Sequence, residues 1–367
     1  MTPRVLFVGR SRLNLPLQPW LAKKWDALSA VFDLRVLNAG EGTGDERFVL
    51  LPPAAAAFYP RLPFAVAREL RVFRPDVVIS SDPFVGVAVR AARPVARSTA
   101  KLVVEVHGDP RTFTRGYGSP SRRLLAPLAD ATARAGIRGA DATRALSTFT
   151  SSVVQDARGV PATACFPTYS DLEVFAEPPP VPVPDEQHIV FVGALEAYKN
   201  IDLLAAAWRE VVRRVPGARL TIVGSGSRLS VVERLVADLP DNVRHEPLLP
   251  PGAVAAELDA ARALVLPSWP EGLGRVVLEA FARGRTVVAT EAGGIVDIVT
   301  DGRDGLLVPP GDEPALVDGV VRVLEDRELA SRLGAAARET YREWHQTAGD
   351  FAAAYRSLVE RVLAGAA

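Results

Sequence analysis

The sequence predicts an α/β protein built from two doubly wound parallel sheets. Its 367 residues exceed what one ordinary core organises. Short apolar runs alternate with helical patterns along the chain, which is typical of βαβ units. The proline-rich stretch 177–184 divides this alternation into two halves. Because proline fixes φ and donates no backbone hydrogen bond, we expect this stretch to be a stiff linker between domains.

In the first half, short apolar runs bounded by charged or small residues indicate strands buried on both faces. The expected strands are Val5–Val8, Leu34–Leu37, Val77–Ser80, Leu102–Val106 and Ala142–Leu146. Helical spacing of apolar residues predicts helices around Trp20–Val31, Phe64–Phe73 and Arg122–Arg138, the last of them started or kinked at Pro127.

The second half repeats the alternation after the prolines. The expected strands are Ile189–Val192, Leu220–Val223, Val243–His245, Ala263–Leu266, Thr286–Ala289 and Leu306–Val308. Helices are expected near 201–215, 228–238, 253–261 and 275–283, and about the last 40 residues read as helix only. A ligand site is therefore expected in a cleft between two doubly wound domains.

Composition excludes several classes of protein. Apolar residues make up 48% and charged residues 23%, the balance of a folded soluble chain. The single cysteine, Cys165, excludes a disulfide framework, and four scattered histidines offer no metal-ligand spacing. No apolar run approaches the ~20 residues of a membrane span, and the N-terminus lacks a signal-peptide pattern. We therefore expect a cytoplasmic protein that binds no metal.

The net charge of zero hides an asymmetry between the halves. Residues 1–176 hold 23 Lys and Arg against 15 Asp and Glu, a net charge of +8, whereas residues 177–367 hold 20 against 28, a net charge of −8. A basic half can indicate an anionic acceptor lipid or membrane surface, and the Arg122–Arg138 helix, with Leu124, Leu125 and Leu128, could lie on such a membrane. Solvated surface arginine explains the count equally well. Nucleic acid is not expected, because no aromatic-basic stacking pattern occurs.

Two turns after strands contain glycine but differ from dinucleotide-binding motifs. The first strand leads into Gly9, Arg10, Ser11 and Arg12, which is not GxGxxG and argues against a dehydrogenase. A later turn contains Gly224 and Gly226 and can bring backbone N–H groups near a phosphate, or can be a tight connection without a ligand.

Residues 266–282 carry the strongest functional pattern. A strand is followed by a loop with Gly272 and Gly274 that opens a helix, whose first N–H groups can bond hydroxyl or anionic oxygens. Glu271 lies in the loop and Glu279 about one turn inside the helix, far enough apart to bind different rings of one extended ligand. Alternatively, Glu271 caps the helix and Glu279 is solvated.

The E-x7-E spacing of Glu271 and Glu279, in a P-S-x-x-E-G-x-G frame, resembles the retaining GT-B glycosyltransferases of family 4, the glycosyl transferases group 1. Residues 191–200 are similar to the donor-phosphate segment G-R-L-x3-K of that family, and residues 293–298 and 301–312 resemble its next loop and strand. The first half matches only loosely.

The resemblance implies the GT-B fold, two Rossmann-like doubly wound domains that face a central cleft. Residues 1–176 would form the acceptor domain, 177–184 the linker and 185–345 the nucleotide-sugar donor domain. A C-terminal helix, 346–367, would cross back to the N-terminal domain. We expect this final helix to contain Trp344, Phe351 and Tyr355.

The resemblance also implies an activity. A sugar would pass from a UDP- or GDP-sugar to an acceptor with retention at the anomeric carbon, and without metal or another cofactor. Lys199 would bind the diphosphate, Glu271 the sugar hydroxyls and Glu279 the ribose. His107, after a strand of the first half, would lie near the reacting sugar, or it is an ordinary hydrogen-bonded histidine. The implied donor-binding set is Gly193, Lys199, Gly224, Gly226, Glu271, Gly272, Leu273, Gly274, Arg275 and Glu279.

Two departures from the family pattern keep other functions open. Ala194 stands where an arginine usually accompanies the lysine, and the glycine pair after the first strand is replaced by Gly9–Arg12. Arg10 or Arg12 would supply the missing cation, or the protein is a slow or inactive binder of nucleotide sugar. An epimerase of the same fold is a further alternative. The donor base cannot be inferred from the sequence, nor can the acceptor, whether lipid-linked, a saccharide or a small molecule.

Overall fold

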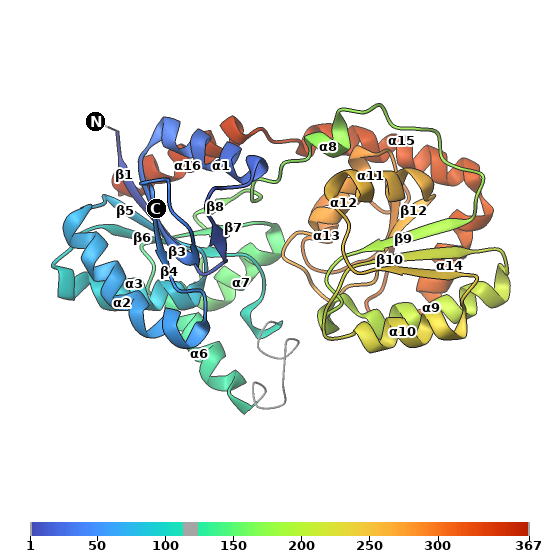
Figure 1. The fold of residues 1–367 in the computed structure, drawn as a ribbon, viewed down its shortest axis with the longest axis horizontal. Helices are drawn as coiled ribbons and strands as arrows, with labels where there is room; N and C mark the ends of the chain where they lie inside the picture. The colour runs from blue at the N-terminus through green and yellow to red at the C-terminus, as the bar shows by residue number, and fades with distance from the viewer. Residues whose placement is uncertain (1, 113–123, 366–367) are drawn as a thin grey trace. The chain divides into compact units, whose positions relative to one another are not determined.

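The computed structural model describes residues 2–112 and 124–365 (Figure 1). These residues form two compact units. The first comprises the described parts of Met1–Arg111, Leu124–Asp171 and Gln346–Ala367, and the second is mainly Leu172–His345. Each unit has its own sheet with helices on both faces.

The sheet of the first unit places β1 at its centre. Its strand order is β2-β3-β1-β5-β6-β7-β8, with β4 paired to β3 and every strand pair parallel. The strands are β1 (Arg4–Val8), β2 (Leu13–Asn14), β3 (Asp33–Glu41), β4 (Phe48–Leu51), β5 (Val77–Ser80), β6 (Lys101–Val106), β7 (Ala142–Ala145) and β8 (Ala164–Cys165).

Alternation along β1 distributes its side chains between two helical layers. Val5 and Phe7 join the apolar cluster of α1 and α16, whereas Leu6 and Val8 join that of α2 and α3. The helices are α1 (Pro19–Val31), α2 (Ala55–Val72), α3 (Pro83–Ala96), α6 (Ala126–Arg138), α7 (Thr148–Arg158) and α16 (Ala348–Leu363). Val5–Val8 are apolar at every position because this part of β1 is buried on both faces, as the sequence indicated.

Helix α2 begins earlier than expected, whereas helix α6 begins where one of the two predicted alternatives placed it. Helix α2 starts at Ala55, nine residues before the predicted Phe64, because it tolerates Pro60 and Pro63 inside its length. Helix α6 starts at Ala126 with Pro127 in its first turn, as one of the two predicted alternatives required. Arg122 and Arg123 of the predicted helix lie outside the described residues.

The sheet of the second unit has the order β11-β10-β9-β12-β13-β14, again with parallel pairs only. Strands added after β9 first extend to one side and then, from β12 onward, to the other. Its strands are β9 (His188–Val192), β10 (Arg219–Val223), β11 (Val243–Glu246), β12 (Ala263–Leu266), β13 (Thr286–Thr290) and β14 (Gly305–Val308). The point of reversal between β9 and β12 is where doubly wound folds bind ligands.

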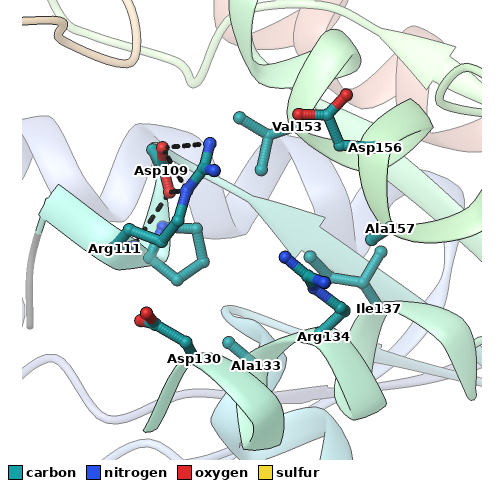
Figure 2. Close-up of a pocket in the computed structure, with 10 residues that line it drawn as sticks. Asp109, Arg111, Asp130, Ala133, Arg134, Ile137, Val153, Asp156 and Ala157 are labelled. Atoms are coloured by element: carbon teal, nitrogen blue, oxygen red, sulfur yellow. Dashed lines mark hydrogen bonds and ion pairs between the residues drawn. The ribbon is translucent and has the colours of Figure 1, made fainter. Parts of the chain in front are cut away.

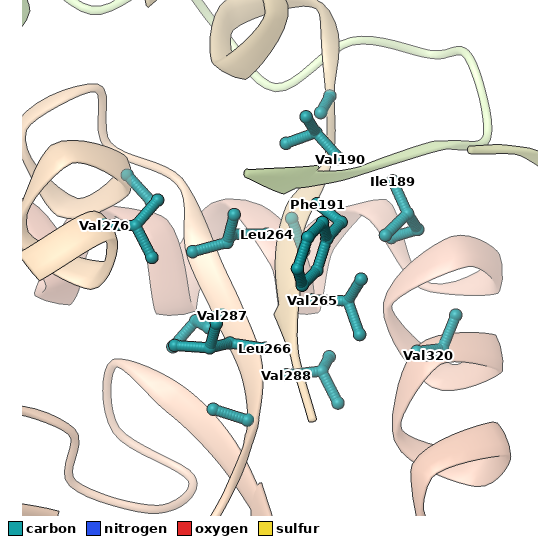
Figure 3. Close-up of a cluster of buried hydrophobic side chains, with 14 of the residues drawn as sticks. Ile189, Val190, Phe191, Leu264, Val265, Leu266, Val276, Val287, Val288 and Val320 are labelled. Carbon is teal, nitrogen blue, oxygen red and sulfur yellow. The ribbon is translucent and has the colours of Figure 1, made fainter. Parts of the chain in front are cut away.

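Helices cover both faces of this second sheet (Figure 1). Phe191, Leu264 and Val288 are buried completely in the core beneath them (Figure 3). The helices are α8 (Glu173–Ala176), α9 (Ile201–Arg214), α10 (Leu229–Asp238), α11 (Pro251–Ala260), α12 (Arg275–Ala282), α13 (Ile295–Ile298), α14 (Glu313–Glu325) and α15 (Arg327–Trp344), with a 3-10 turn at Ala197–Lys199.

The proline-rich stretch 177–184 belongs to the second unit instead of standing between the units. Prolines donate no hydrogen bond, but their carbonyls still accept. The buried Arg283 donates to the carbonyls of Pro178 and Pro179, and the buried Arg285 donates to that of Pro182. The chain therefore passes from one unit to the other at Asp171–Leu172, ahead of the predicted linker.

The last described helix, α16, returns to the first unit. Phe351 and Tyr355 are fully buried there beside α1. Trp344 was expected in the same helix, but it is the last residue of α15 and packs against the core of the second unit. The chain changes units at His345–Gln346, where Thr347 and Asp350 form a capping box that begins α16.

Candidate functional site

The predicted donor-binding residues gather at the reversal point of the second sheet. The loop after β9 runs from Gly193 to Lys199, and the loop after β12 runs from Pro267 to Gly274. These loops leave the carboxyl ends of adjacent strands on which the strand order reverses, the position where doubly wound folds bind ligands. The rest of the predicted set lies in the turn after β10 and in the first two turns of α12.

Lys199 and Glu271 form an ion pair across the two loops. The Nζ atom of Lys199 donates to Oε1 of Glu271 over 2.7 Å, and about nine-tenths of each side chain is buried. Gly193 lies beside this lysine, since a Cβ at position 193 would be in ordinary van der Waals contact with Cε of Lys199, at 3.4 Å. Glu271 therefore does not cap α12, as one interpretation of the sequence suggested; its carboxylate holds the lysine.

Helix α12 begins without a side-chain cap. Its N-cap residue, Gly274, has a φ of +84°, a left-handed conformation that glycine adopts without the steric cost of a Cβ. Gly274 has no side chain that could accept a hydrogen bond from the first N–H groups of the helix. N–H groups at the positive end of a helix dipole can bind oxygen atoms of a ligand.

The turn with Gly224 and Gly226 packs tightly against the loop after β9. The backbone N–H of Leu195 donates to the carbonyl of Ser225 over 2.9 Å. A Cβ at Gly224 would stand 1.9 Å from the carbonyl oxygen of Gly193, and one at Gly226 would stand 2.6 Å from that of Leu195. Close packing of two loops thus accounts for both glycines, whether or not a phosphate binds there.

Gly293 and Gly294 support the loop that carries Glu271. The N–H of Gly294 donates to the carbonyl of Glu271 over 2.8 Å. Gly293 has a φ of +63°, and a Cβ there would stand 2.3 Å from the same carbonyl oxygen. Since this contact involves backbone, a side chain at 293 can be accommodated only if the loop moves.

Replacement of Gly293 by alanine should therefore displace Glu271. We expect Gly293→Ala to lower turnover by up to about 10²-fold, the scale of a ~1 Å misplacement at a reacting centre. Gly302→Ala is the matched control, because Gly302 also has a positive φ, +71°, but a Cβ there meets nothing within 4 Å. Both variants carry backbone strain, so equal turnover in the two would show that the Glu271 loop tolerates the contact.

Glu279 is buried, contrary to the interpretation of a solvated side chain. It is 5% exposed, and its Oε1 lies 2.9 Å from Nε of Arg275, which is mostly exposed. Desolvation outweighs the attraction of Arg275 and Lys199, so the pKa of Glu279 is raised above its usual 4.5. Burying a carboxylate that has only one partner at the surface costs free energy in the ligand-free protein. Its remaining lone pairs can accept hydrogen bonds from a ligand that carries hydroxyl groups.

Because its folded-state pKa is raised, Glu279 should make stability depend on pH. Between pH 4.5 and the raised pKa the folded state binds more protons, so the free energy of unfolding falls as pH rises. We expect the melting temperature of Glu279→Gln to exceed that of the wild type by a margin that grows from pH 4.5 to pH 8. Glu233→Gln, on the exposed side of α10, controls for the lost charge. A margin that stays constant or shrinks would contradict this account.

The arginines of the loop after β1 have partners within the first unit. Nε of Arg10 lies 2.7 Å from Oδ2 of Asp82, and its Nη1 donates to the Tyr59 hydroxyl over 3.1 Å. Asp82 follows β5, so this pair joins the carboxyl ends of two adjacent strands. Arg12 lies 3.3 Å from Glu41 in an exposed pair. Breaking the Arg12–Glu41 pair would cost less free energy than breaking the Arg10–Asp82 pair, because exposed ion pairs contribute little to stability.

His107 follows β6 and contacts a buried polar network. Its Nε2 lies 3.0 Å from Oε2 of Glu105, whose other oxygen accepts from Nη1 of Arg144 over 2.6 Å. Arg144 also donates to the hydroxyl of Tyr355 over 2.9 Å, and that hydroxyl donates to Glu105. Glu105 thus connects the candidate histidine to β7 and to helix α16.

Opposite charge keeps Glu105 of this network ionised. Burial alone would raise the pKa of Glu105, but Arg144 and His107 hold it well below its usual range. Burial and the neighbouring carboxylate raise the pKa of Tyr355 well above its usual value. Tyr355 therefore remains a neutral donor to a carboxylate at neutral pH, and Glu105 accepts from all its neighbours.

Sequence reasoning missed these partners and a nearby polar pocket. The pocket lies between the segment after His107 and helices α6 and α7, where an Asp109–Arg111 pair, 2.8 Å between Nη2 and Oδ2, faces Arg134 and Asp156 (Figure 2). The sequence did contain a signal for the Glu105 network. Glu105 and Arg144 are charged residues inside otherwise apolar strands, and a charged side chain buried in a strand needs a partner of opposite charge.

Two absences apply to the described parts of the chain. Within residues 2–112 and 124–365, no three His, Cys, Asp or Glu side chains gather as metal ligands. None of the helices described there has the length and apolar character to cross a membrane.

Comparison with known proteins adds two domain matches. The family described as glycosyl transferases group 1 matches residues 186–326, and the glycosyl transferase 4-like domain matches residues 15–167. A D-inositol 3-phosphate glycosyltransferase of Segniliparus rotundus is 37% identical over 187 residues, 48% of this chain and 41% of that enzyme. The chain spans about half the length of the curated relatives it matches.

Solved structures match over the whole chain. A sucrose-phosphate synthase of Thermosynechococcus elongatus has a TM-score of 0.78 at 20% identity and covers 99% of this chain and 100% of its own. The Anabaena protein HepE, solved in complex with UDP-glucose, has a TM-score of 0.69 at 17% identity with 99% of both chains covered. The predicted GT-B fold of two parallel-sheet α/β domains is confirmed.

Proposed function

We propose that this chain is an active glycosyltransferase, starting from the family to which it belongs, the GT-B glycosyltransferases of family 4. The observation that carries the proposal is the buried Lys199–Glu271 pair at the reversal point of the second sheet, beside the uncapped start of α12. A cation, a carboxylate and free N–H groups are together what a sugar attached to a diphosphate requires.

The proposed donor is a nucleotide-diphosphate sugar. Lys199 would exchange its bond to Glu271 for one to the diphosphate, and Glu271 would then be free to accept from sugar hydroxyls. The backbone of Leu273–Arg275 would bind the same sugar, and the buried Glu279 would accept from the ribose. The likeness to a protein solved with UDP-glucose supports UDP as the first nucleotide to test.

The proposed reaction is transfer with retention of the anomeric configuration. As the glycosidic bond breaks, negative charge develops on the departing phosphate, where Lys199 and the N–H groups of α12 would stabilise it. His107 of the first unit is proposed to contact the reacting sugar, with Glu105 fixing its ring orientation through the 3.0 Å hydrogen bond. Arg12 or Arg10 is proposed to supply the second phosphate cation that Ala194 lacks.

A panel of nucleotides and nucleotide sugars read by thermal shift tests the donor assignment. A bound donor should stabilise the protein by about 2.7 kcal/mol at one hundred times its Kd. The cognate UDP- or GDP-sugar should raise the melting temperature of the wild type, and Glu271→Gln should weaken that shift. If no nucleotide sugar shifts either protein, the donor assignment is wrong.

Three further measurements test the chemistry. Hydrolysis of the cognate donor without acceptor should be detectable and should persist in EDTA, since no metal is invoked. The anomeric configuration of the product, read by NMR, should equal that of the donor. Tight donor binding with neither hydrolysis nor transfer would favour the alternative that Ala194 motivates, a nucleotide-sugar binder without turnover. An interconverted donor would instead indicate an epimerase.

A further inference from the structure

One side of helix α2 exposes both arginines and large apolar side chains. Arg61, Phe64, Arg68 and Val72 follow one another at spacings of three and four residues, so they share one side of the helix. Phe64 is 79% exposed and Val72 is 63% exposed. Such a stripe is unusual for a helix that already buries its other side in the core of the first unit.

The surface continues onto the neighbouring helix α3. Arg71 extends from the end of α2 and donates through Nη2 to the carbonyl of Val95 over 2.6 Å. Val95 itself is 62% exposed. We call these six residues the arginine face: Arg61, Phe64, Arg68, Arg71, Val72 and Val95.

The arginine face contains no acidic group. The only acid within α2 is Glu69, which is 2% exposed and pairs with Arg35 on the buried side, and α3 contains none. No described carboxylate pairs with Arg61, Arg68 or Arg71. Other arginines of this unit, such as Arg47, do form ion pairs. The positive charge of this face is therefore unbalanced locally.

We propose that the arginine face binds the surface of an anionic lipid bilayer. Arginines attract acidic head groups, and apolar side chains between them gain by entering the boundary with the acyl chains, which is the pattern of an interfacial helix. Nucleic acid fits less well, because the face has one aromatic ring and two valines where base stacking would need several rings. The face is a surface of the first unit alone, so the proposal is independent of the proposed reaction.

The sequence also suggested the Arg122–Arg138 segment for membrane contact, and that prediction stays open, because Leu124, Leu125 and Leu128 are 84%, 60% and 68% exposed. Of the four arginines in Arg122–Arg138, Arg122 and Arg123 lie outside the described residues. Arg138 is engaged, since its Nε donates to the carbonyl of Ala157 over 2.7 Å. Arg134 shares a pocket with Asp130 and Asp156. Helix α2 has the same elements, arginine and apolar side chains, without carboxylates among them.

Sedimentation with lipid vesicles tests the proposal. The wild-type chain should bind vesicles of phosphatidylglycerol and phosphatidylcholine more tightly than vesicles of phosphatidylcholine alone, and 0.5 M salt should weaken the binding. Arg61→Gln, Arg68→Gln and Arg71→Gln should each lower the partition constant about fivefold. Phe64→Ser should lower it about tenfold or more, since a buried aromatic side chain contributes at least this much.

Matched controls lie on the second unit. Arg234→Gln removes an exposed arginine from α10, and Leu248→Ser removes an apolar side chain that is 84% exposed. Neither should change vesicle binding, and donor-induced thermal shifts should be the same in all variants. Equal binding to neutral and anionic vesicles would overturn the proposal. So would a dimer that Phe64→Ser dissociates, or tight RNA binding without vesicle binding.

Discussion

Replacing Lys199 by alanine should lower the rate of sugar transfer by about 10²-fold or more. This is the usual scale for losing one preorganised stabiliser of developing charge. No arginine compensates at position 194, which is alanine. The loss should therefore exceed that in a site with two cations on the same loop. The measurement is the rate of sugar transfer with the cognate donor, or the rate of donor hydrolysis where the acceptor has not been identified.

Loss of the lysine also leaves Glu271 buried without its partner, which can destabilise the fold by itself. The double variant Lys199→Ala/Glu271→Gln separates the two effects, since it removes the unpaired charge. It should recover the melting temperature but not the turnover. Lys101→Ala, at an exposed position on β6, is the matched control for a lost lysine. Near-normal turnover in Lys199→Ala would show that the donor-site assignment is wrong.

Replacing Arg144 by methionine should cost about 3–5 kcal/mol of unfolding free energy, the range for removing one member of a buried ion pair. The side chain is 1% exposed, and Glu105 would be left without its main counter-charge. Since the folded-state pKa of Glu105 is depressed, the stability it contributes is present above its unfolded pKa of about 4.5 and is lost as pH falls. Chemical denaturation at pH 7 and pH 4 measures both effects.

The double variant Arg144→Met/Glu105→Gln should recover part of the lost stability, because no charge then remains buried alone. Arg356→Met, on the exposed side of α16, should change stability by less than about 1 kcal/mol. A similar loss in both arginine variants would mean that the network contributes no more than a surface pair. If Arg144→Met is as stable at pH 7 as the wild type, the network is not a major support of the first unit.

The fold and the donor half of the site could be predicted from sequence because their signals are local. Parallel strands buried on both faces are continuous apolar runs, and the segment 266–282 places its glycines and glutamates within one loop and helix. The state of Glu279 could not be predicted, since burial depends on packing from elsewhere in the chain. The Lys199–Glu271 bond spans 72 residues and was likewise not predicted.

The errors have a common cause in long-range partners. Residues 177–184 resemble a linker because prolines cannot donate, and the arginines that bind their carbonyls come about 100 residues later. Trp344 and Phe351 occur in one helical pattern, yet the break at His345–Gln346 assigns them to different units. Nothing near Glu105 in the sequence indicates that Tyr355 is its partner.

The return of α16 has a consequence for synthesis on the ribosome. The second unit is made of nearly continuous chain, so it can close as soon as its own residues have emerged. The first unit cannot, because its core needs Phe351 and Tyr355, and Tyr355 meets Glu105 across 250 residues. Translation proceeds at about 5–20 residues per second. The apolar side chains of β1 therefore remain without the packing of α16 for on the order of ten seconds or more. The domain translated first is thus the last to finish folding, and during that interval it is the part of the nascent chain that most needs a chaperone.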